Sequence, residues 1–307
     1  MRRLLLRRLA LLAPTLLGVA TLVFAFVHLV PGDPVEIMLG ESAAPADLAS
    51  LRHELGLDRP LAAQYVDFLG HALCGDLGRS LVFHEPVARV IGARYPATLE
   101  LAGTALLLAL GVALPLGVAA AVRPGSALDR LARLASLAGQ CLPSFWLGPL
   151  LILGFSIQLD WLPVSGRGGL PHLVLPAITL GLGMASILVR LTRASMLAVL
   201  GEDYVRTARA KGAPEWRVMG VHALRNALLP VTTVAGLQAG ALLAGAIITE
   251  TVFAWPGLGR LVVQAIDARD YPLVQGCVLA IGLSYVAVNT VTDLLYGAID
   301  PRLADGR

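Results

Sequence analysis

Long apolar stretches are the feature of this sequence that most limits its fold. A helix of about 20 apolar residues is needed to cross a hydrocarbon layer about 30 Å thick. Six such stretches lie at 9–30, 98–122, 134–159, 171–192, 224–253 and 273–297. Charged residues make up only 15% of the chain, against roughly 25% in a soluble globular domain. The sequence therefore predicts an all-α integral membrane protein with six transmembrane helices.

Basic residues indicate how these helices are oriented. If both termini lie in the cytoplasm, 16 of the 24 Lys and Arg residues fall on the inner side of the membrane. Five of the eight outer ones lie in one long loop, where the positive-inside bias is weak. Both termini are therefore predicted to be cytoplasmic. The net charge of +3 reflects this topology, and we predict no nucleic-acid partner.

The predicted helices divide the chain into four parts. These are a cytoplasmic N-terminus with the first transmembrane helix (1–30), an external helical subdomain (31–97), a transmembrane core (98–297) that includes an internal loop (193–223), and a cytoplasmic C-terminal tail (298–307). Turn residues divide the external subdomain into two or three short helices. It is either a solvated cap over the bundle or a docking surface for a soluble partner, and the sequence leaves both open.

The internal loop at 193–223 is a basic, amphipathic segment between apolar helices. Asp203 is predicted to cap a short helix on which Tyr204, Ala208 and Lys211 share one face. Gly212 follows, where a left-handed turn is expected to end this helix.

A second helix is predicted to start at Pro214 and to run through Trp216, Met219 and Val221. Two short helices of this kind can insert into a groove of a partner protein. They can also rest on anionic lipid headgroups as a basic amphipathic loop. In the third apolar stretch, Pro143 and Trp146 are expected to shape a kink.

The sequence shows no catalytic or metal-binding motif. The only lysine, Lys211, is followed by Gly and Ala, so the Gly-Lys-Ser/Thr of a phosphate-binding loop is missing. Zinc-protease and nucleophile-elbow motifs are missing as well. A secondary carrier or channel is the alternative class, but carriers bury ionisable groups near the middle of the bilayer. The ionisable residues of the predicted helices lie near their ends: Glu100, Arg190, Glu250 and Asp293.

Motifs along the whole chain resemble one family. The loop sequence EDYVRTARAKGAPEWRVMGVHALRNALLP, from Glu202 to Pro230, is similar to the EAA loop of binding-protein-dependent ABC importer permeases of the dipeptide, oligopeptide and nickel group, in particular their first, B-type subunit. Seven further strings resemble that group in order: PGDP (31–34), RYPATLEL (94–101), LPSFW (142–146), RASML (193–197), ETVFAWPGLGRL (250–261), RDYPLVQG (269–276) and IDPR (299–302).

The resemblance implies the type I importer permease fold and a role for the internal loop. In that family the matching segment is a coupling helix that docks into a cleft on a cytoplasmic ATPase. The residues implied for ATPase coupling are Tyr204, Thr207, Ala208, Arg209, Lys211 and Gly212. The family's Glu-Ala-Ala pattern falls on Arg206, Thr207 and Ala208, and its first two positions depart from it. Such departures are usual in the peptide and nickel branch, but they put in doubt any ion pair expected of the Glu.

A second candidate group is Trp255, Pro256 and Gly257. From the residues alone it is a tight external turn. The family suggests instead a loop that folds back near the translocation pathway and contacts the docked binding protein.

The resemblance also implies partners and a location. The chain would be a non-catalytic permease subunit in the bacterial cytoplasmic (inner) membrane, surrounded by membrane lipids and forming half of a pathway. It would assemble with a second, related permease subunit, two ATPase subunits and a periplasmic or lipid-anchored solute-binding protein. No cofactor is expected in this chain, because ATP and Mg would bind to the partner subunits. The solute stays open between a di- or oligopeptide, nickel or a nickel complex, and another small solute; the loop at 160–170 is slightly closer to the nickel branch.

Overall fold

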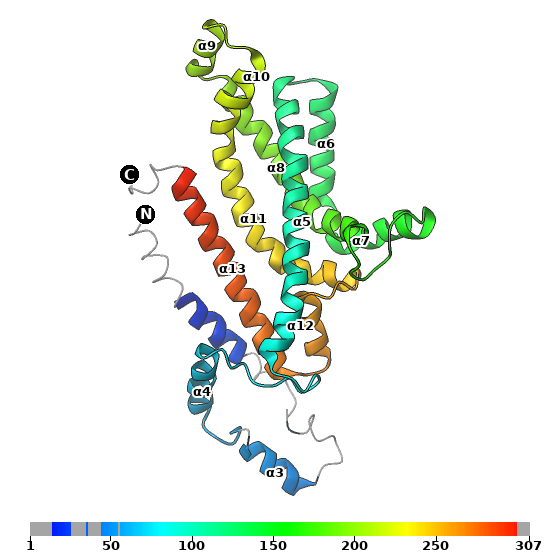
Figure 1. Cartoon of the computed structure of the whole chain (residues 1–307), viewed down its shortest axis with the longest axis vertical. Helices are drawn as coiled ribbons and strands as arrows, with labels where there is room; N and C mark the ends of the chain where they lie inside the picture. Colours follow the sequence, from blue (N-terminus) through cyan, green and yellow to red (C-terminus); the bar gives the residue numbers. More distant parts are fainter. Residues whose placement is uncertain (1–13, 26–34, 36–43, 55, 300–307) are drawn as a thin grey trace. The chain divides into compact units, whose positions relative to one another are not determined.

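Helices account for all regular secondary structure in the part of the chain that is described. The structure is a computed structural model that describes residues 14–25, 35, 44–54 and 56–299 (Figure 1). The one β-type contact among these residues is an isolated antiparallel bridge between Arg79 and Pro86. An all-α chain was predicted, and the structure confirms it.

Four helical stretches are long and apolar enough to cross a membrane. They are α5 (Val87–Val122), α8 (Leu170–Leu200), the stretch Glu215–Ala244 that includes most of α11 (Leu224–Val252), and α13 (Tyr271–Ile299). A fifth span results if the bent pair of α6 (Ala127–Cys141) with α7 (Ser144–Leu151) and the π-helix η1 (Ile152–Gln158) counts as one. Of the predicted first span, only the apolar helix Pro14–Ala25 lies within the described residues.

The expected third span is broken rather than straight. The axes of its two halves meet at 105° between Cys141 and Ser144. Pro143 lies at the break in an extended conformation, with ψ 139°, and is the N-cap residue of α7. Proline has no N–H to donate and disfavours helical geometry in the preceding residue, and Leu142 is extended as well. The kink predicted at Pro143 is therefore confirmed, but it is too large for a single straight span.

Helix α5 begins 11 residues before the predicted span at 98–122, at Val87. Its first turns bury Val87, Val90 and Ile91, and this i, i+3, i+4 spacing is that of an amphipathic helix. Glu100 therefore lies well inside α5. Its carboxylate forms an ion pair with Arg167, at 2.5 Å between Oε2 and Nη2.

The described chain forms two compact units. Of the described residues, unit 1 contains Leu99–Trp255 and Tyr285–Ile299, and unit 2 contains those up to Thr98 together with Pro256–Ser284. Each is described by itself. In unit 1, α8 packs against α6 and α11. Of the residues in the most apolar part of α8, 67% are buried, compared with 28–33% in the other three membrane-length stretches. Helix α8 is therefore the central helix of unit 1.

Unit 2 is built around the first turns of α5, the start of α13 and a short helix, α12 (Leu258–Asp267). Their shared core is apolar and consists of Val87, Val90, Ile91, Leu258, Leu261, Val262, Ala265, Leu273 and Cys277. The unit also contains α3 (Pro45–Glu54) and α4 (Leu61–Leu73). Helix α4 contacts the Pro14–Ala25 helix through Tyr65, whose ring centroid lies 5.3 Å from that of Phe24.

Small residues allow α5 and α8 to approach closely in unit 1. A Cβ atom added at Gly181 would lie 2.8 Å from the backbone oxygen of Ala105, whereas one added at Gly183 of the same helix would meet nothing within 4 Å. We predict that Gly181→Val lowers the thermal unfolding midpoint of the purified chain in nanodiscs, since overpacking costs about 1–3 kcal/mol. The control Gly183→Val should leave the midpoint close to that of the wild type. Equal midpoints for the two variants would contradict this packing.

Candidate functional site

The segment between α8 and α11, residues 201–223, is the candidate site and is called here the connecting segment. It consists of α9 (Asp203–Ala210), a turn at Gly212, α10 (Glu215–Arg217) and the π-helix η2 (Val218–Ala223), which leads directly into α11. The two short helices predicted for this segment are therefore present. Figure 1 shows α9 and α10 beside the end of α8 and the beginning of α11.

The start of α9 differs from the prediction. The predicted cap, Asp203, is the first helical residue, and Glu202 is the N-cap residue, without a side-chain capping hydrogen bond. Asp203 still carries a negative charge in the first turn, where the helix dipole favours one. The Thr207 hydroxyl donates a hydrogen bond to the Asp203 carbonyl oxygen at 2.9 Å, which satisfies the hydroxyl within the helix.

The turn at Gly212 has the predicted left-handed conformation, with φ 79°. The N–H of Gly212 donates to the carbonyl oxygen of Arg209 at 2.9 Å, and the N–H of Ala213 donates to that of Ala208 at 3.2 Å. These bonds satisfy carbonyl groups that the end of α9 leaves without helical partners. Only glycine adopts this conformation without a steric cost, so Gly212 determines where α9 ends.

An ion pair crosses this turn. Arg209 Nε lies 2.8 Å from Glu215 Oε1, and Arg209 Nη2 lies 3.4 Å from Glu215 Oε2. Both side chains are more than a third exposed, at 40% and 62%, so the pair contributes little to stability. Its effect is to restrain α9 and α10 relative to each other. Arg209 therefore has an acidic partner within the chain itself.

Helix α9 exposes almost all of its surface. Val205 alone is buried in it, and Ala208 is half-buried. The predicted coupling residues Tyr204, Thr207, Ala208, Arg209, Lys211 and Gly212 all lie on α9 or on the turn that ends it. The structure thus brings all six together on one short helix. An exposed helix of this length, held at both ends, has the geometry for binding in a groove of a partner.

The connecting segment is joined to the transmembrane helices by a small core. Met196 of α8 packs with Ala121 of α5, Ala223 of η2 and Ala227 of α11, and all four are buried. Helix α9 contacts η2, and the amide of Asn226 in α11 donates to the Tyr204 hydroxyl at 2.7 Å. The connecting segment is therefore in contact with α5, α8 and α11 through one small core. No pattern in the sequence predicted this core.

A buried ion pair between α6 and α8 was not predicted. Asp129, in the first turn of α6, has a side chain that is 1% exposed. Its Oδ1 lies 2.5 Å from Arg193 Nε and its Oδ2 lies 2.9 Å from Arg193 Nη2. The N–H of Gly125 also donates to Oδ2, at 2.9 Å. Arg193 lies one turn before Met196, so this pair ties the beginning of α6 to the helix that carries the core.

The second candidate group is only partly a turn. Trp255 is fully buried, and its N–H donates to the Glu250 carbonyl oxygen at 2.8 Å. The Arg167 guanidinium carbon lies 6.0 Å from the Trp255 ring centroid, a distance at which a cation–π attraction operates. Trp255 ends its part of unit 1, whereas Gly257 is the N-cap residue of α12 in unit 2. The Trp255 side chain is therefore packed inside unit 1.

Helix α12 was missed by the sequence prediction. Leu258, Leu261, Val262 and Ala265 are buried in it, and their i, i+3, i+4, i+7 spacing is the signal that could have found it. Among the residues that the structure describes, no three His, Cys, Asp or Glu side chains are placed to hold a metal ion.

The described chain is thus a bundle of apolar helices, four or five of them long enough to cross a membrane, with an exposed helical segment at their ends. Comparisons with known proteins agree. Residues 113–305 match the family of binding-protein-dependent transport system inner membrane components, and residues 1–102 match the N-terminal part of membrane components of such systems. The chain belongs to this family.

Relatives of the chain cover its whole length. It is 46% identical over 335 residues to the dipeptide transport system permease protein DppB of Escherichia coli K12, with 99% of each chain covered. It is 47% identical over 298 residues to the glutathione transport system permease protein GsiC of Salmonella typhimurium, with 97% of each covered. The inward-facing MetNI methionine ABC transporter is similar in fold, with a TM-score of 0.58 and 19% identity over 69% of this chain and 96% of that chain.

The protein is therefore a non-catalytic, membrane-embedded transport subunit of an ATP-driven importer. The family implies ATPase and binding-protein partners and a place in the inner membrane. The predicted resemblance, the type I permease fold and the predicted class are confirmed. The alternative class, a carrier or channel without an ATPase partner, is not supported by these comparisons.

The ion pair between Asp129 and Arg193 generates a prediction. Removing Asp129 leaves Arg193 without its acidic partner, and removing Arg193 leaves the buried Asp129 carboxylate with Arg133, at 3.4 Å, as its remaining cation. Asp129→Asn and Arg193→Gln should therefore each lower the thermal unfolding midpoint of the chain in nanodiscs. The double variant should be little less stable than either single variant, because residues that act as a pair are not additive. If the double variant loses the sum of the two single decreases in unfolding midpoint, Asp129 and Arg193 do not stabilise the chain as a pair.

Proposed function

We propose that the protein forms half of the transmembrane pathway of an importer for short peptides, and that α9 is the element that docks on the ATPase. The observation that carries this proposal is the construction of the connecting segment. Helix α9 exposes its surface, ends at a left-handed glycine, and contacts η2, which packs against the ends of three long helices. An element that docks and also transmits a displacement needs all three properties.

Within this proposal the six predicted residues have different tasks. Tyr204 anchors α9 to α11 through Asn226, and Gly212 sets the direction of the chain after α9. Thr207, Lys211 and Arg209 are exposed and supply the surface that the ATPase contacts. Ala208 is small and half-buried, which lets the helix lie close to its neighbours. Arg209 also restrains the turn through Glu215.

We further propose that the connecting segment and both termini lie in the cytoplasm, with 31–97 as the external subdomain, 98–297 as the transmembrane core and 298–307 as a cytoplasmic tail. The excess of Lys and Arg on that side of the spans supports this orientation. The complete importer would contain a second, related permease subunit, two ATPase subunits and one periplasmic or lipid-anchored binding protein. Trp255, Pro256 and Gly257 would lie near the pathway or the docked binding protein.

Short peptides are the solute that the relatives favour. The proteins compared are permeases named for dipeptides, for di- and tripeptides and for glutathione, itself a tripeptide. They match at 46–47% identity over nearly the full length of both chains. Nickel has no such support among them, so we propose a peptide even though the loop at 160–170 is slightly closer to the nickel branch.

The experiment is uptake by the complete importer reconstituted in lipid vesicles. A labelled dipeptide should accumulate when ATP is present, whereas nickel ions should not. Gly212→Val forces a β-branched residue into the left-handed region, at a strain of about 1–3 kcal/mol. It should abolish binding-protein-stimulated ATP hydrolysis and uptake while the chain still inserts into the membrane.

Two controls isolate the backbone effect at Gly212. Asn tolerates the left-handed conformation, so Gly212→Asn should retain most of the uptake. Gly220→Val makes the same change within η2, at a glycine that has free space around a Cβ atom and no positive φ, and it should be mild. Full coupling in Gly212→Val would show that α9 is not the coupling helix.

A further inference from the structure

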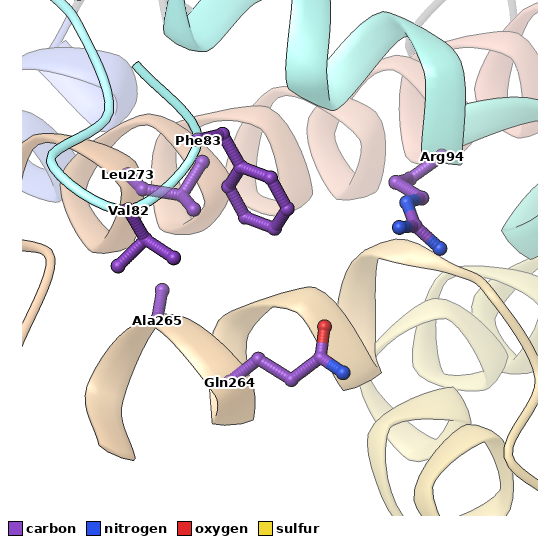
Figure 2. Close-up of a pocket in the computed structure, with 6 residues that line it drawn as sticks. All are labelled: Val82, Phe83, Arg94, Gln264, Ala265 and Leu273. Atoms are coloured by element: carbon purple, nitrogen blue, oxygen red, sulfur yellow. The ribbon is translucent and has the colours of Figure 1, made fainter. Parts of the chain in front are cut away.

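A half-open cavity at the surface of unit 2 lies outside the segment discussed so far, and two of its lining side chains, Val82 and Phe83, are 49% and 39% exposed. Its volume is about 310 Å³, at the lower limit of the range found for small-molecule sites. It is lined by Val82, Phe83, Arg94, Gln264, Ala265 and Leu273. Figure 2 shows the apolar side chains Val82, Phe83 and Leu273 gathered at one end, with the polar groups of Arg94 and Gln264 at the other.

One wall of the cavity, the loop from Arg79 to Pro86, is fixed by a buried carboxylate. Asp270 is fully buried just before α13, and its Oδ2 accepts hydrogen bonds from the Ser80 hydroxyl at 2.5 Å and from the Val82 N–H at 3.1 Å. Its Oδ1 accepts from the N–H of Leu273 at 3.2 Å. Because one side chain holds both the loop and the start of α13, Val82 and Leu273 are kept together.

The floor of the cavity is equally well supported. Ala265 of α12 and Leu273 of α13 belong to the apolar core of unit 2. The start of α12 is tied to α5 because the N–H of Leu258 donates to the Thr98 hydroxyl at 2.7 Å. A site built on packed helices is already formed before a ligand arrives, so little binding free energy is lost to rearrangement.

The polar end of the cavity has donors without acceptors. Arg94 is half-buried, yet its guanidinium makes no hydrogen bond or ion pair with any residue that the structure describes. Gln264 is exposed, and its side-chain amide makes no hydrogen bond within the described part of the chain. A planar guanidinium matches a carboxylate through two parallel hydrogen bonds. This end therefore suits a carboxylate, and the other end suits an apolar side chain.

We propose that this cavity is an external subsite for the C-terminal residue of a short peptide. The free carboxylate of the peptide binds Arg94 and Gln264, and its last side chain packs against Phe83 and Leu273. This inference rests on the proposed function, because it takes the solute to be a peptide and takes the N-terminal end of α5 to lie outside the membrane. The subsite recognises the free C-terminal carboxylate, which every unmodified peptide has, so it binds peptides of many sequences.

The test compares one dipeptide in two chemical forms. Alanyl-phenylalanine with a free C-terminus and the same dipeptide as its C-terminal amide are titrated against the purified full-length chain in nanodiscs, by calorimetry or ligand-observed NMR. The free acid should bind at least tenfold more tightly, which corresponds to about 1.4 kcal/mol. In Arg94→Gln the two forms should bind within about twofold of each other, since hydrogen bonds to a charged group are the stronger ones.

A matched variant is available on the same helix. Arg89 is exposed and does not line the cavity, so Arg89→Gln should keep the preference for the free acid. Equal binding of acid and amide by the wild type, or a preference that survives Arg94→Gln, overturns the subsite. If Arg94→Gln leaves peptide binding unchanged but weakens association of the soluble binding protein, the cavity is a protein contact and the peptide assignment is wrong.

Vesicle uptake separates this inference from the proposed function. If the complete importer accumulates the dipeptide while the chain in nanodiscs does not distinguish acid from amide, the proposed solute stands and the subsite is overturned. If the chain prefers the acid but the importer accumulates no dipeptide, the subsite is supported and the proposed solute is wrong.

Discussion

The contact between Met196 and three alanines is the interaction on which the connecting segment depends. Ala121, Ala223 and Ala227 bring α5, η2 and α11 against α8, and their small side chains allow the backbones to approach closely. A close-packed interior does not deform gradually, so elements joined in this way move together. The ion pair between Asp129 and Arg193 extends the connection to α6. In the proposed coupling, a displacement of α9 is therefore passed to α5, α6, α8 and α11.

Charges in this apolar chain show how the rest of the molecule is organised. The buried Asp129 pairs with Arg193, because a charge away from water is costly unless a partner compensates it. Glu100 and Arg167 also form an ion pair, with side chains that are 33% and 42% exposed. Arg94 differs from these residues, since no described residue compensates its charge. A half-buried cation beside a cavity is the kind of group with which an anionic ligand forms an ion pair. The charges that are already paired within the chain hold helices together.

The sequence predicted the features that depend on local rules. The apolar stretches predicted α8, α11 and α13 to within a few residues at most of their ends. The Lys-Gly-Ala-Pro string predicted the left-handed conformation of Gly212. Features that depend on distant residues were missed. Asp129 lies in what the sequence presents as a polar loop, and only its approach to Arg193, 64 residues away, shows its role. The size of the bend at Pro143 depends on packing in the folded chain, and proline alone indicates only its position.

The central claim is that the connecting segment and the ends of the long helices behave as one body. It is tested most directly by the distance between spin labels at Arg206→Cys in α9 and Arg225→Cys in α11, with the three native cysteines replaced, measured in the complete importer. Both positions are exposed, so the labels should not disturb the core. The account predicts one distance distribution that is the same without nucleotide and with ATP trapped. A second, separate distance that appears with ATP would mean that α9 swings independently of α11, and would contradict the account.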